Sequence, residues 1–290
     1  MIRRLLLYWD LLFGWRRLNI RSGDFILDMG SGDNPCVRAD IVCDKYLRDN
    51  AERAGEMKLQ VYPHQKLIMA DAEKLPFKDK AFDYVVCRHL LEHINNPEIF
   101  FKDLMRVAMA GYIESPSELM ERLYGWPFHV WFIKLENKKL ILARKSSSNN
   151  HSSELPDALK KTPDFERLVR KNQDIFLIKY EWKDRIDYEI ISCQPQGGME
   201  DFKRAKLTPR PFGQKEAGPV WKRWLKYWIL KTLRLLWFSP PRELLDFLAC
   251  PECKGSLQKE KDRFVCYKCR RYYPIVDEVP FLIKEESNEL

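Results

Sequence analysis

The sequence lacks any long uncharged run. The longest stretch without Asp, Glu, Lys or Arg is the 11 residues from Leu123 to Ile133, well short of the roughly 18 that cross a bilayer. The first twenty residues are apolar and basic like a secretion signal, but Asp10 interrupts the apolar run and no small-residue cleavage site follows. We therefore predict no transmembrane helix, and a retained amphipathic helix over residues 1–19.

The sequence also lacks a general excess of charge. Its 50 Lys and Arg outnumber its 42 Asp and Glu, but residues 201–240 alone hold ten basic and two acidic side chains, so the rest of the chain is balanced. The hydrophobic content of 45% is too high for a disordered chain. The sequence thus predicts one large and one small globular domain with a local basic segment.

A secreted disulfide framework is missing as well. Of the eight cysteines, four form two CxxC pairs near the C-terminus. The other four are scattered, at Cys36, Cys43, Cys87 and Cys193. This distribution favours a reducing, cytoplasmic compartment.

Short apolar runs alternate with polar or helical stretches in the first half of the chain. Continuous apolar runs bounded by turn signals are typical of buried parallel strands, and strands that alternate with helices imply crossover connections. The predicted fold is α/β, a doubly wound Rossmann-like sheet. The expected strands are 25–30, 39–44, 66–71, 82–87 and 110–115, with a helix before the last and hairpins at 131–144 and 175–193. Residues 146–153 are an expected polar loop, and 194–219, rich in Pro and Gly, an expected linker.

Acidic residues follow the predicted strands at the edge where such sheets bind nucleotides. Asp28, Gly30 and Gly32 end the first strand, Asp44 ends the second and Asp71 the third. The glycines allow close approach of a ligand to the backbone. The third glycine of the dinucleotide fingerprint is absent, which weakens an NAD interpretation. Each acid alone could be a solvated or loop-capping carboxylate, but three at one edge favour a nucleoside-containing ligand.

The segments LDMGSGDNP, DIVCDKY, ADAEKLPFKDKAFDYVVCRHLLEH and YIESPS together resemble class I S-adenosylmethionine (SAM)-dependent methyltransferases, over about residues 20–133. The resemblance implies a SAM cofactor and a methyltransferase domain over 20–193. It also implies the cofactor-binding residues. Asp28, Gly30 and Gly32 would line the methionine and ribose side, Asp44 would hold the ribose hydroxyls, Asp71 with the Ala72 backbone would contact adenine, and His89 would lie near the sulfonium.

Methyl transfer needs little acid–base chemistry, because the sulfonium already activates the methyl group and the protein mainly aligns the acceptor. The candidate bases are His89, Glu92, His93, Glu114 and His129. His93 is also consistent with a helix-surface or capping histidine, and His129, among aromatic residues, with a packed core histidine. We assign no catalytic residue.

Four cysteines near the C-terminus have the spacing of a zinc site. Cys250, Cys253, Cys266 and Cys269 form C-x2-C-x12-C-x2-C, which predicts four thiolates around a structural Zn²⁺; a redox CxxC or free thiols are the alternatives. Residues 243–283, including the YPIVDEVPFLI ending, are similar to the small zinc-ribbon activator subunit of tRNA and release-factor methyltransferases. The sequence leaves open whether the ribbon docks on its own methyltransferase domain, on a second copy or on another partner.

Residues 219–238 form a basic aromatic segment, expected to be helical over 220–240. Tryptophans and leucines fall on one helical face and Lys and Arg on the other. Binding at an anionic membrane surface, packing on the methyltransferase domain, and RNA binding all fit this pattern, RNA least well. The resulting hypothesis is a cytoplasmic methyltransferase, peripheral on the inner face of the membrane, with a lipid-linked or small polar acceptor. The alternatives are methylation of tRNA or a translation protein, and a non-catalytic scaffold.

Overall fold

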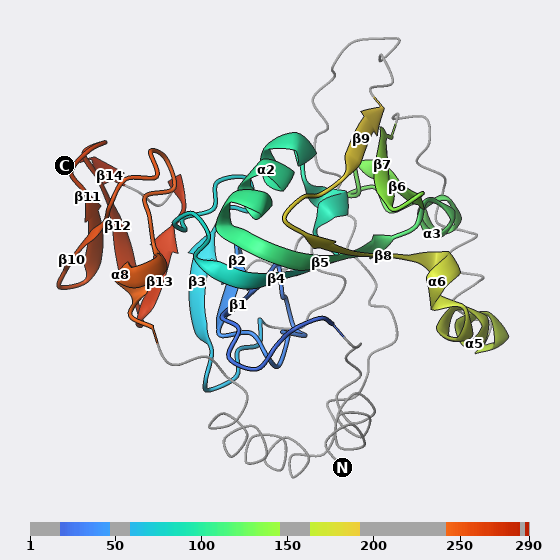
Figure 1. Ribbon diagram of the computed structural model, residues 1–290, viewed down its shortest axis with the longest axis horizontal. Helices are drawn as coiled ribbons and strands as arrows, with labels where there is room; N and C mark the ends of the chain where they lie inside the picture. Colours follow the sequence, from blue (N-terminus) through green and yellow to red (C-terminus); the bar gives the residue numbers. More distant parts are fainter. Residues whose placement is uncertain (1–17, 47–58, 146–162, 192–241, 285–287, 290) are drawn as a thin grey trace.

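The computed structural model describes residues 18–46, 59–145, 163–191, 242–284 and 288–289 (Figure 1). The predicted N-terminal helix lies almost entirely outside these residues. The polar loop at 146–153, the linker and the basic aromatic segment lie wholly outside them.

The centre of the molecule is a parallel sheet, and all five predicted strands are present in it. They are β1 (Ile26–Met29), β2 (Ile41–Asp44), β3 (Lys66–Ala70), β4 (Phe82–Arg88) and β5 (Ala108–Pro116), in the spatial order β3-β2-β1-β4-β5. Asp28 of β1 is in register with Val42 on one side and Val86 on the other. The order reverses at β1, which places a crevice at the carboxyl ends of the strands. The doubly wound prediction is confirmed.

The connection between β4 and β5 contains the short 3-10 helix η1 (Leu91–His93) and the helix α2 (Pro97–Val107). The Asn96 side chain accepts a hydrogen bond from the Ile99 N–H at 3.1 Å, and Pro97 occupies the first turn, which together define the start of α2. Phe100 and Leu104 are fully buried, whereas Ile99 is about half exposed. The buried face of the helix therefore contains Phe100 and Leu104, whereas Ile99 points partly toward solvent.

The first predicted hairpin is confirmed and the second is wrong. β6 (Trp131–Glu136) and β7 (Lys139–Arg144) pair antiparallel around a tight turn at Asn137 and Lys138, both with positive φ. In the second segment, β8 (Leu177–Lys183) pairs antiparallel with β5, while β9 (Tyr188–Ile191) pairs parallel with β7. Alternating burial makes each segment a strand, but it carries no information about the partner, so β8 and β9 join different sheets.

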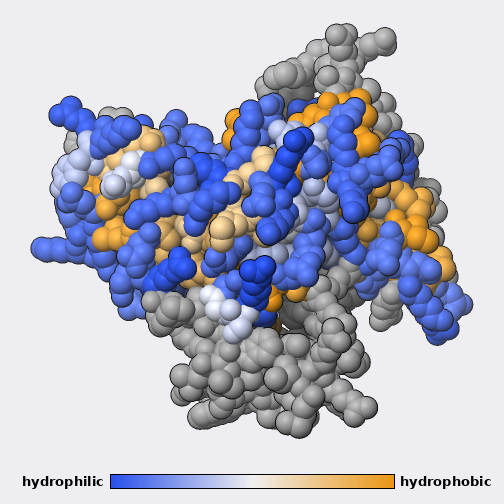
Figure 2. Space-filling model, in the orientation of Figure 1, coloured by the Kyte–Doolittle hydropathy of each residue, from blue (hydrophilic) through white to orange (hydrophobic). Residues whose placement is uncertain are grey.

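Three short helices lie beyond β8, at one end of the molecule (Figure 1). They are α3 (Glu118–Tyr124), α5 (Pro163–Lys171) and α6 (Gln173–Phe176). Each carries an exposed large apolar side chain: Leu119 is 45% exposed, Leu168 50% and Ile175 56%. Figure 2 shows hydrophobic areas at this end of an otherwise mostly hydrophilic face.

The C-terminal domain consists of the helix α8 (Leu244–Phe247) and small strands. The strands are β10 (Gln258–Glu260), β11 (Arg263–Cys266), β12 (Arg271–Val276), β13 (Val279–Leu282) and β14 (Asn288–Glu289). β13 pairs parallel with β3, with Phe281 opposite Met69 and Leu282 opposite Ala70. The strands of the small domain thus continue the central sheet (Figure 1).

The two domains share one hydrophobic core. Phe247 of α8 is 1% exposed and lies among Phe25, Phe77 and Phe82, with ring centroids 5.3, 6.3 and 6.0 Å away. Backbone hydrogen bonds cross the boundary from the Lys78 N–H to the Phe247 carbonyl and from the Ala249 N–H to the Pro76 carbonyl, both at 2.9 Å. The question that the sequence left open is therefore answered: the cysteine-containing domain docks on the sheet of its own chain.

Candidate functional site

A pocket of about 280 Å³ lies at the carboxyl ends of the central strands, near the lower end of the usual size of small-molecule sites. Most of the predicted cofactor residues line it, namely Gly30, Gly32, Asp44, Asp71, Ala72 and His89. Lys45, Tyr46, Glu73, Leu90, His93, Ile94 and Asn95 also line it and were not predicted as cofactor contacts. Each of these residues either lies next to a predicted residue in the sequence or belongs to the β4–α2 connection. Their closeness in sequence to the predicted residues is the only signal that could have indicated them.

The glycine turn after β1 forms the floor of the pocket. Gly30 and Gly32 have φ of 66° and 54°, the left-handed region that favours glycine. A Cβ at Gly30 would lie 3.0 Å from Leu90 Cδ2. The chain therefore needs glycine here both for its conformation and for the packing of Leu90 across the turn.

Two carboxylates face the pocket from the ends of β2 and β3, and the backbone fixes their orientation. Asp44 accepts hydrogen bonds from the N–H groups of Gly32 at 3.3 Å and Tyr46 at 3.1 Å. Asp71 accepts one from the Glu73 N–H at 2.9 Å and forms a 2.7 Å ion pair with Lys45. The ion pair with Lys45 has no sequence signal, because Lys45 and Asp71 are 26 residues apart.

Asp28 differs from the other predicted cofactor residues, because it is fully buried below the pocket and is not among the lining residues. One carboxylate oxygen accepts a hydrogen bond from the Cys36 N–H at 2.5 Å, while the other has no hydrogen-bond partner within the described part of the chain. Burial raises the pKa of Asp28 to about 6, against the lowering influence of Arg88 and of the Cys36 N–H. Asp28 thus holds the turn that carries the glycines.

His89 stands at the mouth of the pocket in a strained conformation. Its φ is 51°, unusual for a residue with a Cβ, and its N–H is bonded to the Glu114 carbonyl at 2.8 Å. The half-exposed ring lies 3.5 Å from a Glu92 oxygen and 3.7 Å from a Glu114 oxygen. The two carboxylates therefore hold the imidazole between them, beside the cofactor pocket.

Of the remaining candidate bases, Glu92 and His129 are buried, whereas His93 and Glu114 are partly exposed. Burial alone would raise the pKa of Glu92, but the adjacent His89, 3.5 Å away, and the charges of the surrounding histidines lower it to about 2. Burial lowers the pKa of His93 to about 4, so its ring is neutral at pH 7. His93 stacks on Phe128 and lines the pocket, unlike a helix-surface histidine. His129 is 7% exposed and hydrogen-bonded to Glu121, as expected for a packed core histidine.

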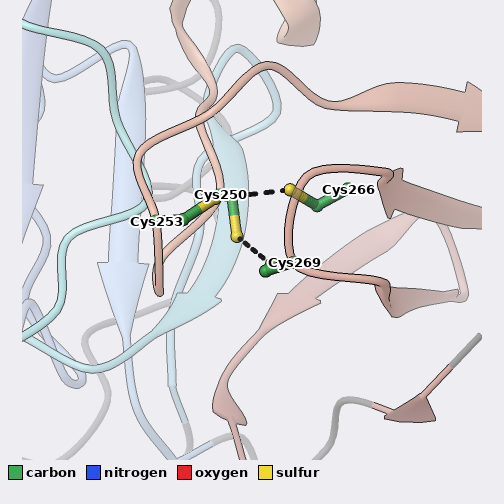
Figure 3. Close-up of side chains that lie close together, drawn as sticks. All are labelled: Cys250, Cys253, Cys266 and Cys269. Carbon is green, nitrogen blue, oxygen red and sulfur yellow. Dashed lines mark hydrogen bonds between the residues drawn. The ribbon is translucent and has the colours of Figure 1, made fainter.

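The four predicted metal ligands converge in the C-terminal domain (Figure 3). Their sulfurs all lie within 4.8 Å of one another. The Cys250–Cys269 and Cys253–Cys266 sulfurs are 3.4 and 3.5 Å apart, close to the roughly 3.8 Å edge of a tetrahedron with 2.3 Å zinc–sulfur bonds. The Tyr273 hydroxyl lies 3.4 Å from the Cys250 sulfur. The geometry fits four thiolates around one Zn²⁺.

Among the described helices, none is both long and apolar enough to cross a membrane.

Comparison with known proteins identifies both domains. Residues 27–112 match the methyltransferase domain family Methyltransf_11, and residues 242–278 match the Trm112p-like protein family. A demethylmenaquinone methyltransferase of Renibacterium salmoninarum is 26% identical over 206 residues, which cover 68% of this chain and 84% of that protein. A UPF0434 protein of Dechloromonas aromatica is 41% identical over 49 residues, which cover 16% of this chain and 84% of that protein.

Other similarities cover less or are more distant. The chain spans only 16% of the length of the tetraacyldisaccharide 4'-kinases of two Nitrosomonas species that it matches, at 45% identity over 64 residues. A complex of the Haloferax volcanii Trm112 methyltransferase activator with a methyltransferase has 13% identity and a TM-score of 0.38, over 61% of this chain and 88% of that one. The family matches confirm the predicted resemblances: the chain contains a methyltransferase domain of the Methyltransf_11 family and, in the same polypeptide, a Trm112p-like domain of the UPF0434 kind.

Proposed function

We propose that this chain binds SAM in the pocket at the carboxyl ends of β1 to β4 and transfers its methyl group to a lipid-linked or small polar acceptor. The observation that carries the proposal is the convergence of Asp44, Asp71 and the glycine turn on one cavity. Asp44 suits the ribose hydroxyls, and Asp71 with the Ala72 backbone suits the adenine. Gly30 and Gly32 give the methionine portion access to the backbone.

When bound, the sulfonium of SAM supplies an already activated methyl group. The residues of this chain then have to hold the cofactor, exclude water and align the acceptor. His89 lies where the β4 end meets the pocket and is fixed by Glu92 and Glu114, so it is placed to orient an acceptor hydroxyl or amine. This role requires a hydrogen bond rather than a dedicated strong base.

Two observations support an acceptor with a lipid portion. One relative is named as a demethylmenaquinone methyltransferase. The helices α3, α5 and α6, each with one exposed large apolar side chain, lie at one end of the molecule. The basic aromatic segment at 219–238 would add a contact with anionic lipid, which we expect to hold the enzyme at the inner face of the membrane.

The Trm112p-like domain has a structural role in this proposal. Zn²⁺ bound by Cys250, Cys253, Cys266 and Cys269 would fold the small domain, because a domain this short rarely buries enough apolar surface to fold without a metal or another crosslink. The folded domain in turn pairs its strand β13 with β3 at the edge of the central sheet, and Asp71 directly follows β3. The metal would therefore support the cofactor pocket without taking part in the reaction.

Incubation of the protein with methyl-labelled SAM and a fractionated cell extract tests the proposal. We expect label in the lipid or small-molecule fraction, and less of it with Asp44→Ala at a SAM concentration that does not saturate the variant. Label in RNA or protein would instead favour the tRNA or translation-protein alternative. A folded wild-type protein that fails to bind SAM in calorimetry would refute the enzyme and favour a scaffold.

Vesicle sedimentation tests the membrane contact separately. Trp224→Glu with Trp228→Glu should abolish binding to anionic vesicles, whereas high salt should only weaken it, because screening leaves apolar burial intact. Wild-type protein that ignores such vesicles would remove the membrane surface from the list of partners.

A further inference from the structure

A second group of metal-ligand side chains lies next to the cofactor pocket, away from the four cysteines. Glu92 and His93 come from η1, and His129 comes from the loop between α3 and β6. One ligand atom from each of the three lies within 4.8 Å of the others. The His93 and His129 rings are nearly perpendicular, with centroids 4.7 Å apart.

The hydrogen bonds of these residues leave potential metal-binding atoms of all three available. His129 Nδ1 is 2.6 Å from Glu121 Oε2, so a carboxylate fixes Nδ1 as the N–H donor and Nε2 carries the lone pair. Glu92 Oε2 accepts a hydrogen bond from Ser115 at 2.9 Å. Glu92 Oε1 and His93 Nδ1 are buried and have no hydrogen-bond partner among the residues that the structure describes.

Such an arrangement is costly unless something positive lies between the three atoms. Glu92 is 2% exposed, and its Oε1 has no hydrogen bond among the described residues and only a 3.5 Å ion-pair contact with the half-exposed His89, so its lost hydration is poorly compensated. Lys145 is 2.6 Å from Glu121 and balances that carboxylate. His89, 3.5 Å away and half exposed, is the ion-pair partner of Glu92 within the described ranges.

We propose that Glu92, His93 and His129 form a second metal site, for a divalent first-row transition ion such as Zn²⁺. Two imidazoles and one carboxylate are ligands that this class of ion prefers, and Glu121 would be the outer carboxylate that orients a ligating histidine. Bonds of about 2.0 to 2.2 Å separate tetrahedral ligand atoms by roughly 3.3 to 3.6 Å, so small side-chain rotations would close the present spacing.

Three protein ligands leave a coordination position open, unlike the closed four-cysteine site. His93 also lines the cofactor pocket, so the open position would be next to it. The proposed ion is therefore placed to take an oxygen or nitrogen of a small molecule as its further ligand. Binding of the ion itself does not depend on which acceptor is methylated.

Cobalt binding to the full-length protein, with its thiolate-bound zinc left in place, tests the proposal. Co²⁺ should bind at one equivalent per chain with visible bands but without thiolate-to-cobalt charge transfer, and elemental analysis should show one zinc and one cobalt. Glu92→Gln or His93→Gln should abolish the cobalt and retain the zinc. Glu121→Gln should weaken cobalt binding 10- to 100-fold, as expected of an outer carboxylate.

The matched control is Glu98→Gln, because Glu98 is exposed on α2 and its ion-pair partner within the described residues is the exposed Lys102. It should bind cobalt like the wild type. If Glu92→Gln does not fold, as judged by circular dichroism, His93→Gln decides. Two results would overturn the proposal: wild-type protein that takes up no cobalt beyond the thiolate site, or a folded His93→Gln variant that binds cobalt as tightly as the wild type. Either result would leave a proton shared between Glu92 and His129 as the explanation of the cluster.

Discussion

Replacement of Phe247 by alanine should destabilise the methyltransferase domain, although Phe247 belongs to the C-terminal domain. Its ring is 1% exposed and packs against Phe25, Phe77 and Phe82 of the methyltransferase domain. Truncating a buried phenylalanine costs about 3 to 5 kcal/mol of unfolding free energy, through lost burial and the remaining cavity. The loss should fall on both domains, because one core serves both.

Hydrogen–deuterium exchange read by mass spectrometry measures this effect by region. If the slowest amides of β1 and β4 exchange through global unfolding, their protection should fall roughly 100- to 4,000-fold. Leu245→Ala is the matched control, because Leu245 lies on the same short helix but is 38% exposed, and it should change protection little. Unchanged protection of β1 and β4 in Phe247→Ala, with loss confined to residues 242–284, would refute the shared core.

Three further predictions address the metal, the cofactor and Asp28. Cys253→Ser or Cys266→Ser should cost the protein one zinc per chain, as measured by elemental analysis, and should lower the melting temperature of the whole molecule. An unchanged melting temperature would contradict a stabilising role of the small domain for the methyltransferase domain. Asp44→Ala should weaken SAM binding in calorimetry by on the order of 1 to 3 kcal/mol, because the ribose hydroxyls lose their acceptor; equal affinities would remove Asp44 from the site. The buried Asp28 has a pKa of about 6, above its unfolded value of 3.8, so its charge destabilises the fold at high pH and protonation relieves this as the pH falls. Between pH 8 and pH 5 the wild type should therefore gain about 1.4 kcal/mol of urea-unfolding stability relative to Asp28→Asn, and a difference that is constant with pH would show that Asp28 has an ordinary pKa.

The sequence by itself determined the strands of the central sheet and the two domain families. Buried parallel strands are continuous apolar runs, and the positions of Asp44 and Asp71 at strand ends follow from those runs alone. The C-x2-C-x12-C-x2-C spacing likewise determined the four-cysteine cluster, because each pair is local and both pairs lie within one small domain.

The tertiary structure alone decided which distant segments meet. The partner of a strand depends on tertiary packing and not on the alternation of apolar and polar residues along the strand. The sequence therefore could not show that β8 and β9 belong to different sheets, or that β13 pairs with β3. The same holds for the ion pair of Lys45 with Asp71. It also holds for the cluster of Glu92, His93 and His129, because 35 residues separate His93 from His129 in the sequence and only the fold brings them together. Sequence patterns report the local periodicity of burial, whereas a site is assembled by contacts between elements, and only the folded chain contains those.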